Sequence, residues 1–172
     1  MKKGASGTGK YEALLERCRG LEAVPTAVAH PCEETARAGA VEAGAKGLIV
    51  PILVGPVARV REVARKAGVD LAGVRLVDVP HSHAAAEKAV ELVRQGEAEL
   101  LMKGSLHTDE LLGAAAEREA GVRTARRIRH GFLMEVPTYH KVLIVPDAAI
   151  KIAPGLAATG RICQNPGDPA IG

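Results

Sequence analysis

The sequence predicts an α/β fold in which an open parallel sheet carries helices on both faces. Strand patterns alternate with helical patterns along the chain, which is typical of parallel βαβ units. The 172 residues are 47% hydrophobic but only 2% aromatic, so the core has to be built from Val, Leu, Ile and Ala. A chain of this length suits one domain with a short start of a second.

The first part of the chain is expected to form a helix, a strand, a helix and a strand. Apolar residues at helical spacing predict a helix at 11–18, and a short strand follows at 25–29. An alanine-rich segment predicts a helix at 33–43. The continuous apolar run at 47–54 indicates a strand buried on both faces, with a break possible at Pro51, which removes a ladder donor.

The middle of the chain continues the alternation. Pro56 suits the first turn of a helix, and Gly68 is its stop signal. A strand is expected at 74–79. Ser82 is then a suitable N-cap for a helix with one apolar side, which ends at Gly96.

The last regular elements surround a polar loop. Residues 99–103 predict a strand, and the loop 104–107 leads into a helix that Thr108 or Asp109 caps and that reaches about Ala120. Two further strands are expected at 128–136 and 141–145. From these patterns we expect a disordered tail at 1–10, an N-terminal α/β domain at 11–135, and the start of a second domain with an irregular tail at 136–172.

Composition excludes several classes of function. The net charge of +3 is too small to indicate a nucleic-acid or membrane partner, and few aromatic rings are present to stack on bases. No apolar run approaches the roughly 20 residues of a membrane span. The three cysteines lack zinc-ligand spacing and favour a reducing compartment. We therefore expect a cytoplasmic protein.

A G-x-x-x-x-G-K pattern stands near the N-terminus, from Gly4 to Lys10. A phosphate-binding P-loop follows a buried strand and continues with Ser or Thr as a magnesium ligand. No strand precedes this pattern, and Tyr11 follows it. We interpret the segment as a tail.

Two further patterns are explained as well by ordinary structure. A metal at His81 and His83 would need a third ligand and supporting hydrogen bonds, whereas a loop leading into a helix also accounts for the pair. The alternating residues Ser105, His107 and Asp109 contain the side chains of a catalytic triad. Triad members must converge in space, which three residues on one short loop rarely do.

The loop after Lys103 is the better candidate, because ligands of open α/β sheets bind beyond the carboxyl ends of the strands. Gly104 would let a ligand approach the backbone, and Ser105 and Thr108 supply hydroxyls. The following helix presents free N–H groups and a partial positive charge. These features predict a site for a phosphate or a carboxylate. The alternative is a capped helix whose lysine points into solvent.

The segment 103–111 (KGSLHTDEL) resembles the signature of the phosphate acetyltransferase and phosphate butyryltransferase family. The likeness is closest to the branch described as enoyl-CoA hydratase/phosphate acetyltransferase proteins, and it extends from about residue 25 to about residue 152. Four other segments support it in the same order, at 32–35, 51–56, 79–83 and 123–127.

The resemblance implies transfer of an acetyl or butyryl group: acyl-CoA + phosphate ⇌ acyl phosphate + CoA. It implies an isocitrate/isopropylmalate dehydrogenase-like architecture of two domains with the site between them, and a homo-oligomer for the full-length protein. Coenzyme A is a substrate, no other cofactor is implied, and no metal is needed. The residues expected to bind the substrates are Lys103, Gly104, Ser105, His107, Thr108, Arg123, Thr124, Arg126 and Arg127.

The sequence also departs from the family's pattern. It resembles roughly the first half of such proteins, so we expect an incomplete fold whose catalytic residues lie in the missing C-terminal part. Arg129, Pro146 and Lys151 stand where the family tends to have other residues. We expect little or no turnover by this chain alone. The alternative function is an inactive fragment that serves only as a CoA- or phosphate-binding module or as a partner subunit.

Overall fold

The computed structural model describes residues 9–122 and 131–146. Two compact units are present: within the described ranges, residues 19–122 form the larger one, and residues 9–18 and 131–146 form the smaller one. This division differs from the domain limits expected from the sequence, which stay predictions.

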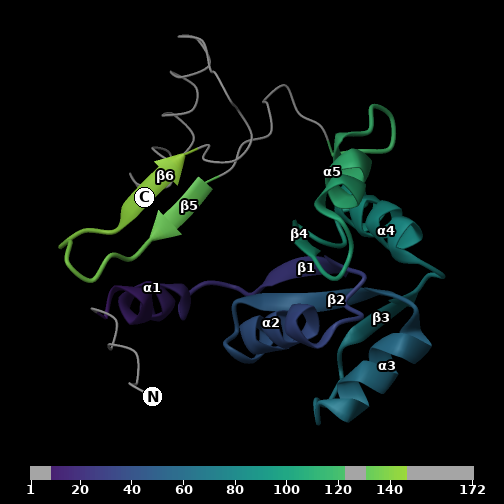
Figure 1. Cartoon of the computed structure of the whole chain (residues 1–172), viewed down its shortest axis with the longest axis horizontal. Coiled ribbons are helices and arrows are strands. Elements are labelled where there is room, and N and C mark those ends of the chain that lie inside the picture. The colour runs from purple at the N-terminus through teal and green to yellow at the C-terminus, as the bar shows by residue number, and fades with distance from the viewer. Residues whose placement is uncertain (1–8, 123–130, 147–172) are drawn as a thin grey trace. The chain divides into compact units, whose positions relative to one another are not determined.

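The larger unit contains a parallel sheet of four strands in the order β3-β2-β1-β4 (Figure 1). Helices connect consecutive strands, as the alternating pattern predicts. The parallel α/β fold is therefore confirmed. The strands are β1 (Val24–Ala29), β2 (Ile49–Gly55), β3 (Arg75–Asp78) and β4 (Leu100–Lys103).

Helices cover both faces of this sheet. The helices α2 and α3 pack on one face, and α4 and α5 pack on the other (Figure 1). Parallel sheets are stable in water only when both faces are covered in this way. The bounds of the helices are α2 (Glu34–Ala45), α3 (Val57–Lys66), α4 (Ser82–Arg94) and α5 (Thr108–Ala116).

The core is aliphatic, as the composition predicts. Apart from Cys32, the buried hydrophobic side chains in the described residues are Ala, Val, Leu and Ile. On the α4 side, Ala27 and Ala29 of β1 meet a row of alanines that includes Ala85 and Ala89 of α4. Small side chains let this helix approach the sheet closely, so a core without large rings is still well filled.

The strand β2 continues through Pro51 without a break. Pro51 lies opposite Thr26 of β1, yet its missing N–H would point to the other side, toward β3. Pairing with β3 begins only at Ile52. Proline is therefore tolerated here, because no donor is required of it.

Three predicted helix ends need correction. The N-cap of α5 is His107, so Thr108 and Asp109 are its first two helical residues and neither is the cap. The N-cap of α4 is His81, whose Nδ1 accepts a hydrogen bond from the Ala84 N–H, so Ser82 is the first helical residue instead. The helix α5 ends at Ala116 and does not reach Ala120. The Glu117 carboxylate accepts the N–H groups of the next residues, Ala120 among them, and this turn replaces the expected last helical turn.

The smaller unit contains α1 (Lys10–Cys18) and an antiparallel pair, β5 (Gly131–Met134) and β6 (Leu143–Pro146). Both strands are shorter than expected, and residues 128–130 of the first lie outside the described residues. The α1 N-terminus is tied to this pair through the Lys10 amide, which donates to the Glu135 carboxylate at 3.3 Å. No helix in the described ranges is both long and apolar enough to span a membrane.

Candidate functional site

The connections that follow β1 and β4 leave the carboxyl ends of these strands toward opposite faces of the sheet. These strands are parallel neighbours, with Ala29 opposite Lys103. After β1 the chain crosses to α2 on one face, whereas after β4 it crosses to α5 on the other. The two connections separate here, and open α/β sheets bind their ligands at such points.

A hollow of about 660 Å³ lies at this edge of the sheet. The loops after β1 and β4 line it, together with the first residues of α4 and α5. Predicted site residues, from Lys103 to His107, are among its walls, and Thr108 is exposed at the start of α5. The polar side chains that line it are His30, Glu33, Ser82, Lys103, Ser105, His107 and Glu110.

Lys103 supplies the positive charge of the hollow. Its side chain is exposed, and its amine donates to the carbonyl oxygen of Gly104 at 3.3 Å. An ammonium group has three N–H donors, so two remain for solvent or for an anion. The amine can therefore serve as the anion-binding group predicted from the sequence.

Gly104 is buried against β1, and this packing explains the glycine. A Cβ at this position would overlap the carbonyl oxygens of Ala29 and His30. The Gly104 N–H donates to the Ala29 oxygen at 2.9 Å, which extends the ladder between β1 and β4. The close approach that glycine permits here is thus to the neighbouring strand, whereas we expected an approach to a ligand.

Ser105 joins the two loops of the hollow. Its hydroxyl donates to the His30 carbonyl oxygen at 2.7 Å and accepts the Cys32 N–H at 3.0 Å. Because the hydroxyl proton is directed to a carbonyl, Ser105 does not form the triad that its spacing to His107 and Asp109 suggests. Beside it, burial raises the pKa of the Cys32 thiol.

The start of α5 already holds a carboxylate of its own. Glu110 accepts the N–H of the N-cap residue His107 and the hydroxyl proton of Ser82, both at 3.0 Å. The His107 N–H and then the Ser82 hydroxyl lower the pKa of the Glu110 carboxyl. A carboxylate at this place also offsets the partial positive charge of the helix terminus. The binding of another anion at this place would therefore depend on Lys103 more than on the amides of the helix.

The arginine-rich part of the predicted site, from Arg123 to Arg127, includes Thr124 and Arg126 and lies outside the described residues. Its role in binding anionic groups stays a prediction.

The histidines before and within α4 have local partners. His81 caps the helix, and the ring of His83 lies 3.5 Å from the Glu87 carboxylate. Asp78 accepts the Val57 N–H at 2.9 Å, which ties β3 to the start of α3. Within residues 9–122 and 131–146, no three His, Cys, Asp or Glu side chains cluster as metal ligands. The absence of a metal stays a prediction.

Lys10 of the N-terminal glycine pattern begins α1. Its amine donates to the carbonyl oxygens of Val136 and Tyr139 in the β5–β6 connection. These contacts give the lysine a structural role within the smaller unit. The preceding residues 4–8 lie outside the described residues.

Four polar residues of the hollow were not predicted as site residues: Ser82, Glu110, His30 and Glu33. His30 and Glu33 follow the predicted strand at 25–29, and a polar pair just beyond a strand's carboxyl end is a usable signal. The sequence does not show that β1 lies beside β4, because strand order cannot be predicted from local patterns.

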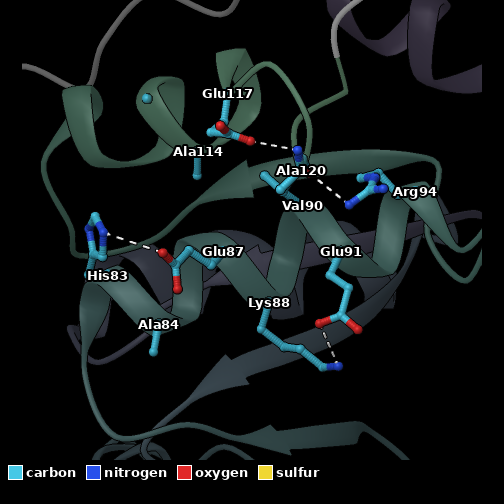
Figure 2. A pocket seen from close by; sticks show the side chains of 11 residues that line it. His83, Ala84, Glu87, Lys88, Val90, Glu91, Arg94, Ala114, Glu117 and Ala120 are labelled. Atoms are coloured by element: carbon cyan, nitrogen blue, oxygen red, sulfur yellow. Dashed lines mark hydrogen bonds and ion pairs between the residues drawn. The ribbon is translucent and has the colours of Figure 1, made fainter.

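A second hollow, of about 650 Å³, lies between α4 and α5 (Figure 2). Its charged groups largely pair with one another: Lys88 with Glu91 at 2.8 Å, and His83 with Glu87. Arg94 donates to the Ala120 carbonyl oxygen at 3.3 Å. This second hollow is formed by the sides of helices and not by the ends of strands, so it is the weaker candidate for a ligand site.

Comparison with known proteins adds evidence of relationship. No protein-family model matches the chain. Over 156 residues it is 53% identical to a phosphate acetyltransferase of Rhizobium meliloti. The aligned region covers 91% of this chain and 49% of that protein. It is 30% identical over 144 residues to a phosphate butyryltransferase of Clostridium beijerinckii, with 84% of this chain and 48% of that protein covered.

Solved structures agree in fold. A phosphotransacetylase from Streptococcus pyogenes matches with a TM-score of 0.75 at 18% identity, covering 95% of this chain and 58% of that one. A branched-chain phosphotransacylase from Enterococcus faecalis matches with a TM-score of 0.66 at 21% identity, covering 86% and 51%. The chain spans about half the length of the named relatives it matches. The resemblance seen in its motifs is thus confirmed: the chain is similar, over most of its own length, to phosphate acetyltransferases and phosphate butyryltransferases.

Proposed function

We propose that this chain carries the phosphate- and CoA-binding part of a phosphate acyltransferase, which catalyses acyl-CoA + phosphate ⇌ acyl phosphate + CoA. The observation that carries the proposal is the hollow between the ends of β1 and β4. Its walls include Lys103 and the loop of the family-like motif, at the place where α/β sheets bind ligands. The sequence identity to a named phosphate acetyltransferase supports the same reaction.

The chemistry of this reaction matches an anion-binding crevice. A phosphate oxygen has to attack the thioester carbonyl, so two negatively charged molecules must be held together against their repulsion. A lysine amine at the mouth of the hollow lowers that repulsion, and fixed positions for both partners supply much of the rate. Coenzyme A enters as a substrate, and the proposed reaction needs no resident cofactor and no metal.

A second candidate function is a CoA- or phosphate-binding module without turnover. It is favoured by the Ser105 hydroxyl, which is engaged with the backbone of His30 and Cys32.

Calorimetric titration with inorganic phosphate and with CoA tests the binding function. Lys103→Ala removes one charge-assisted contact and is expected to weaken phosphate binding about tenfold. Lys66→Ala is the matched control, because it removes the same charge from α3, where Lys66 pairs with Glu62 at 2.7 Å. The control should bind like the wild type.

The result that contradicts the proposal is the absence of binding at millimolar phosphate and CoA. Equal affinities of Lys103→Ala and the wild type would remove the lysine from the site. Thiol release from acetyl-CoA and butyryl-CoA in the presence of phosphate separates the two candidate functions. Release above a boiled control indicates the acyltransferase, and binding without release indicates the module.

Two further parts of the proposal rest on the sequence resemblance: the isocitrate/isopropylmalate dehydrogenase-like arrangement of two domains and a homo-oligomeric full-length protein. A cytoplasmic location and the lack of nucleic-acid and membrane partners are proposed from composition and charge.

A further inference from the structure

His30 has an unusual backbone conformation. Its φ is 53°, and it is the one non-glycine residue with a positive φ in the described part of the chain. A side chain in this left-handed region is strained, and Gly or Asn would occupy it at lower cost. Strain of this kind persists where the surrounding structure enforces it, and it concentrates at functional sites.

The surrounding protein fixes the backbone of His30. Its N–H donates to the Val54 carbonyl oxygen at 2.7 Å. Its carbonyl oxygen accepts the Ser105 hydroxyl at 2.7 Å and the Ser105 N–H at 2.9 Å. The strand β2 and the loop after β4 thus hold the residue at the end of the ladder, which explains how the strained conformation is maintained.

One ring nitrogen is fixed as well. Nδ1 of His30 lies 3.0 Å from the carbonyl oxygen of Ser105. A carbonyl oxygen can only accept a hydrogen bond, so Nδ1 carries the proton. In the neutral ring, Nε2 is then an unprotonated acceptor. Among the described residues no hydrogen-bond partner is found for Nε2, and the half-buried ring lines the hollow.

We propose that Nε2 of His30 is a contact for the phosphate substrate in the hollow between β1 and β4. This inference rests on the proposed function. Ala29 and Lys103 are paired across the two strands, so the lysine lies one residue away from the position opposite His30. Adjacent strands are separated by about 4.8 Å, which places the amine and the imidazole on neighbouring strand ends.

Phosphate near neutral pH suits this pair of groups. It carries both negatively charged oxygens and a P–OH group, so the amine of Lys103 can bind an oxygen while Nε2 accepts the P–OH proton in a hydrogen bond. When the ring is protonated, Nε2–H donates to a phosphate oxygen instead. A carboxylate has no O–H group near neutral pH and uses only the second arrangement. His30 therefore favours phosphate over a carboxylate.

His30→Asn separates the structural role of the ring from the proposed contact. The Asn amide can replace Nδ1–H as a donor to Ser105, and Asn tolerates the left-handed backbone, but the variant has no group at the Nε2 position. We expect its melting temperature to stay within about 3 °C of the wild type and its phosphate affinity to fall about tenfold. His83→Asn, on α4 outside this hollow, is the control and should bind phosphate like the wild type.

Nitrogen-15 NMR of the wild-type chain tests the contact without any substitution. The His30 ring is expected to show the Nδ1–H tautomer, and titration with inorganic phosphate is expected to shift its Nε2 resonance. An Nε2–H tautomer, or phosphate binding that leaves this resonance in place, overturns the assignment of His30. If Lys103→Ala still weakens phosphate binding in that case, the proposed function stands. Absence of phosphate binding by the wild type overturns both.

Discussion

Replacing Gly104 by alanine is expected to destabilise the chain strongly. The added Cβ would overlap the backbone carbonyls of Ala29 and His30, which cannot move aside as flexible side chains do. The loop must then retreat from β1 and weaken the bonds of the Gly104 and Ser105 N–H groups, each 2.9 Å long. Overpacking costs roughly 1–3 kcal/mol, and each weakened bond adds up to about 1 kcal/mol. We therefore expect a loss of about 2–4 kcal/mol.

Gly113→Ala is the matched control, since it makes the same chemical change on α5, where the new Cβ would meet no atom within 4 Å apart from the neighbouring backbone of its own helix. Alanine in a helix is more favourable than glycine, so this variant should gain about 0.5–1 kcal/mol. Urea unfolding followed by circular dichroism suits a chain without Trp. With a slope of about 2 kcal/mol/M, the midpoint of Gly104→Ala should fall by about 1–2 M. Similar midpoints for both variants would refute the packing argument.

The remaining predictions concern one carboxylate and one thiol. Because the pKa of Glu110 is lowered in the folded chain, its stabilising contribution is present above the unfolded pKa and is lost as the pH falls through the folded pKa. Glu110→Gln should therefore lower the melting temperature at pH 7 and match the wild type near pH 3; an equal difference at both pH values would contradict this. The residue Cys32 is 3% exposed and the pKa of its thiol is raised, so iodoacetamide should label it at least about tenfold more slowly in the folded chain than in urea, as read by peptide mass spectrometry. Equal labelling rates would show that the thiol is accessible.

Local patterns were sufficient for most elements of the larger unit. The strand from Leu100 to Lys103 and the helix from Thr108 follow from an apolar run, a glycine and a capping sequence that act over a few residues. The three corrected helix ends are different in kind. His81 rather than Ser82 caps α4, His107 rather than Thr108 or Asp109 caps α5, and Glu117 ends α5, because side chains compete for free backbone groups at these places.

The chemical content of the site was partly visible from the sequence. The motif from Lys103 onward could be placed at a strand's carboxyl end, and the lysine amine is indeed exposed there. The contacts that Gly104 and Ser105 make could not be predicted from the sequence. Their partners are Ala29, His30 and Cys32, more than seventy positions earlier in the chain, and only the pairing of β1 with β4 brings them together.

The sequence by itself determined the element types, the aliphatic core and the likeness to phosphate acyltransferases, because these depend on residue order and composition. Tertiary structure alone decided the strand order, and with it the hollow that contains His30 and Glu33. The physical reason is that hydrogen bonds between strands use backbone groups common to every residue. Which strand lies beside which is settled by how all the helices cover the two faces together, and the positions of the site residues follow from that choice.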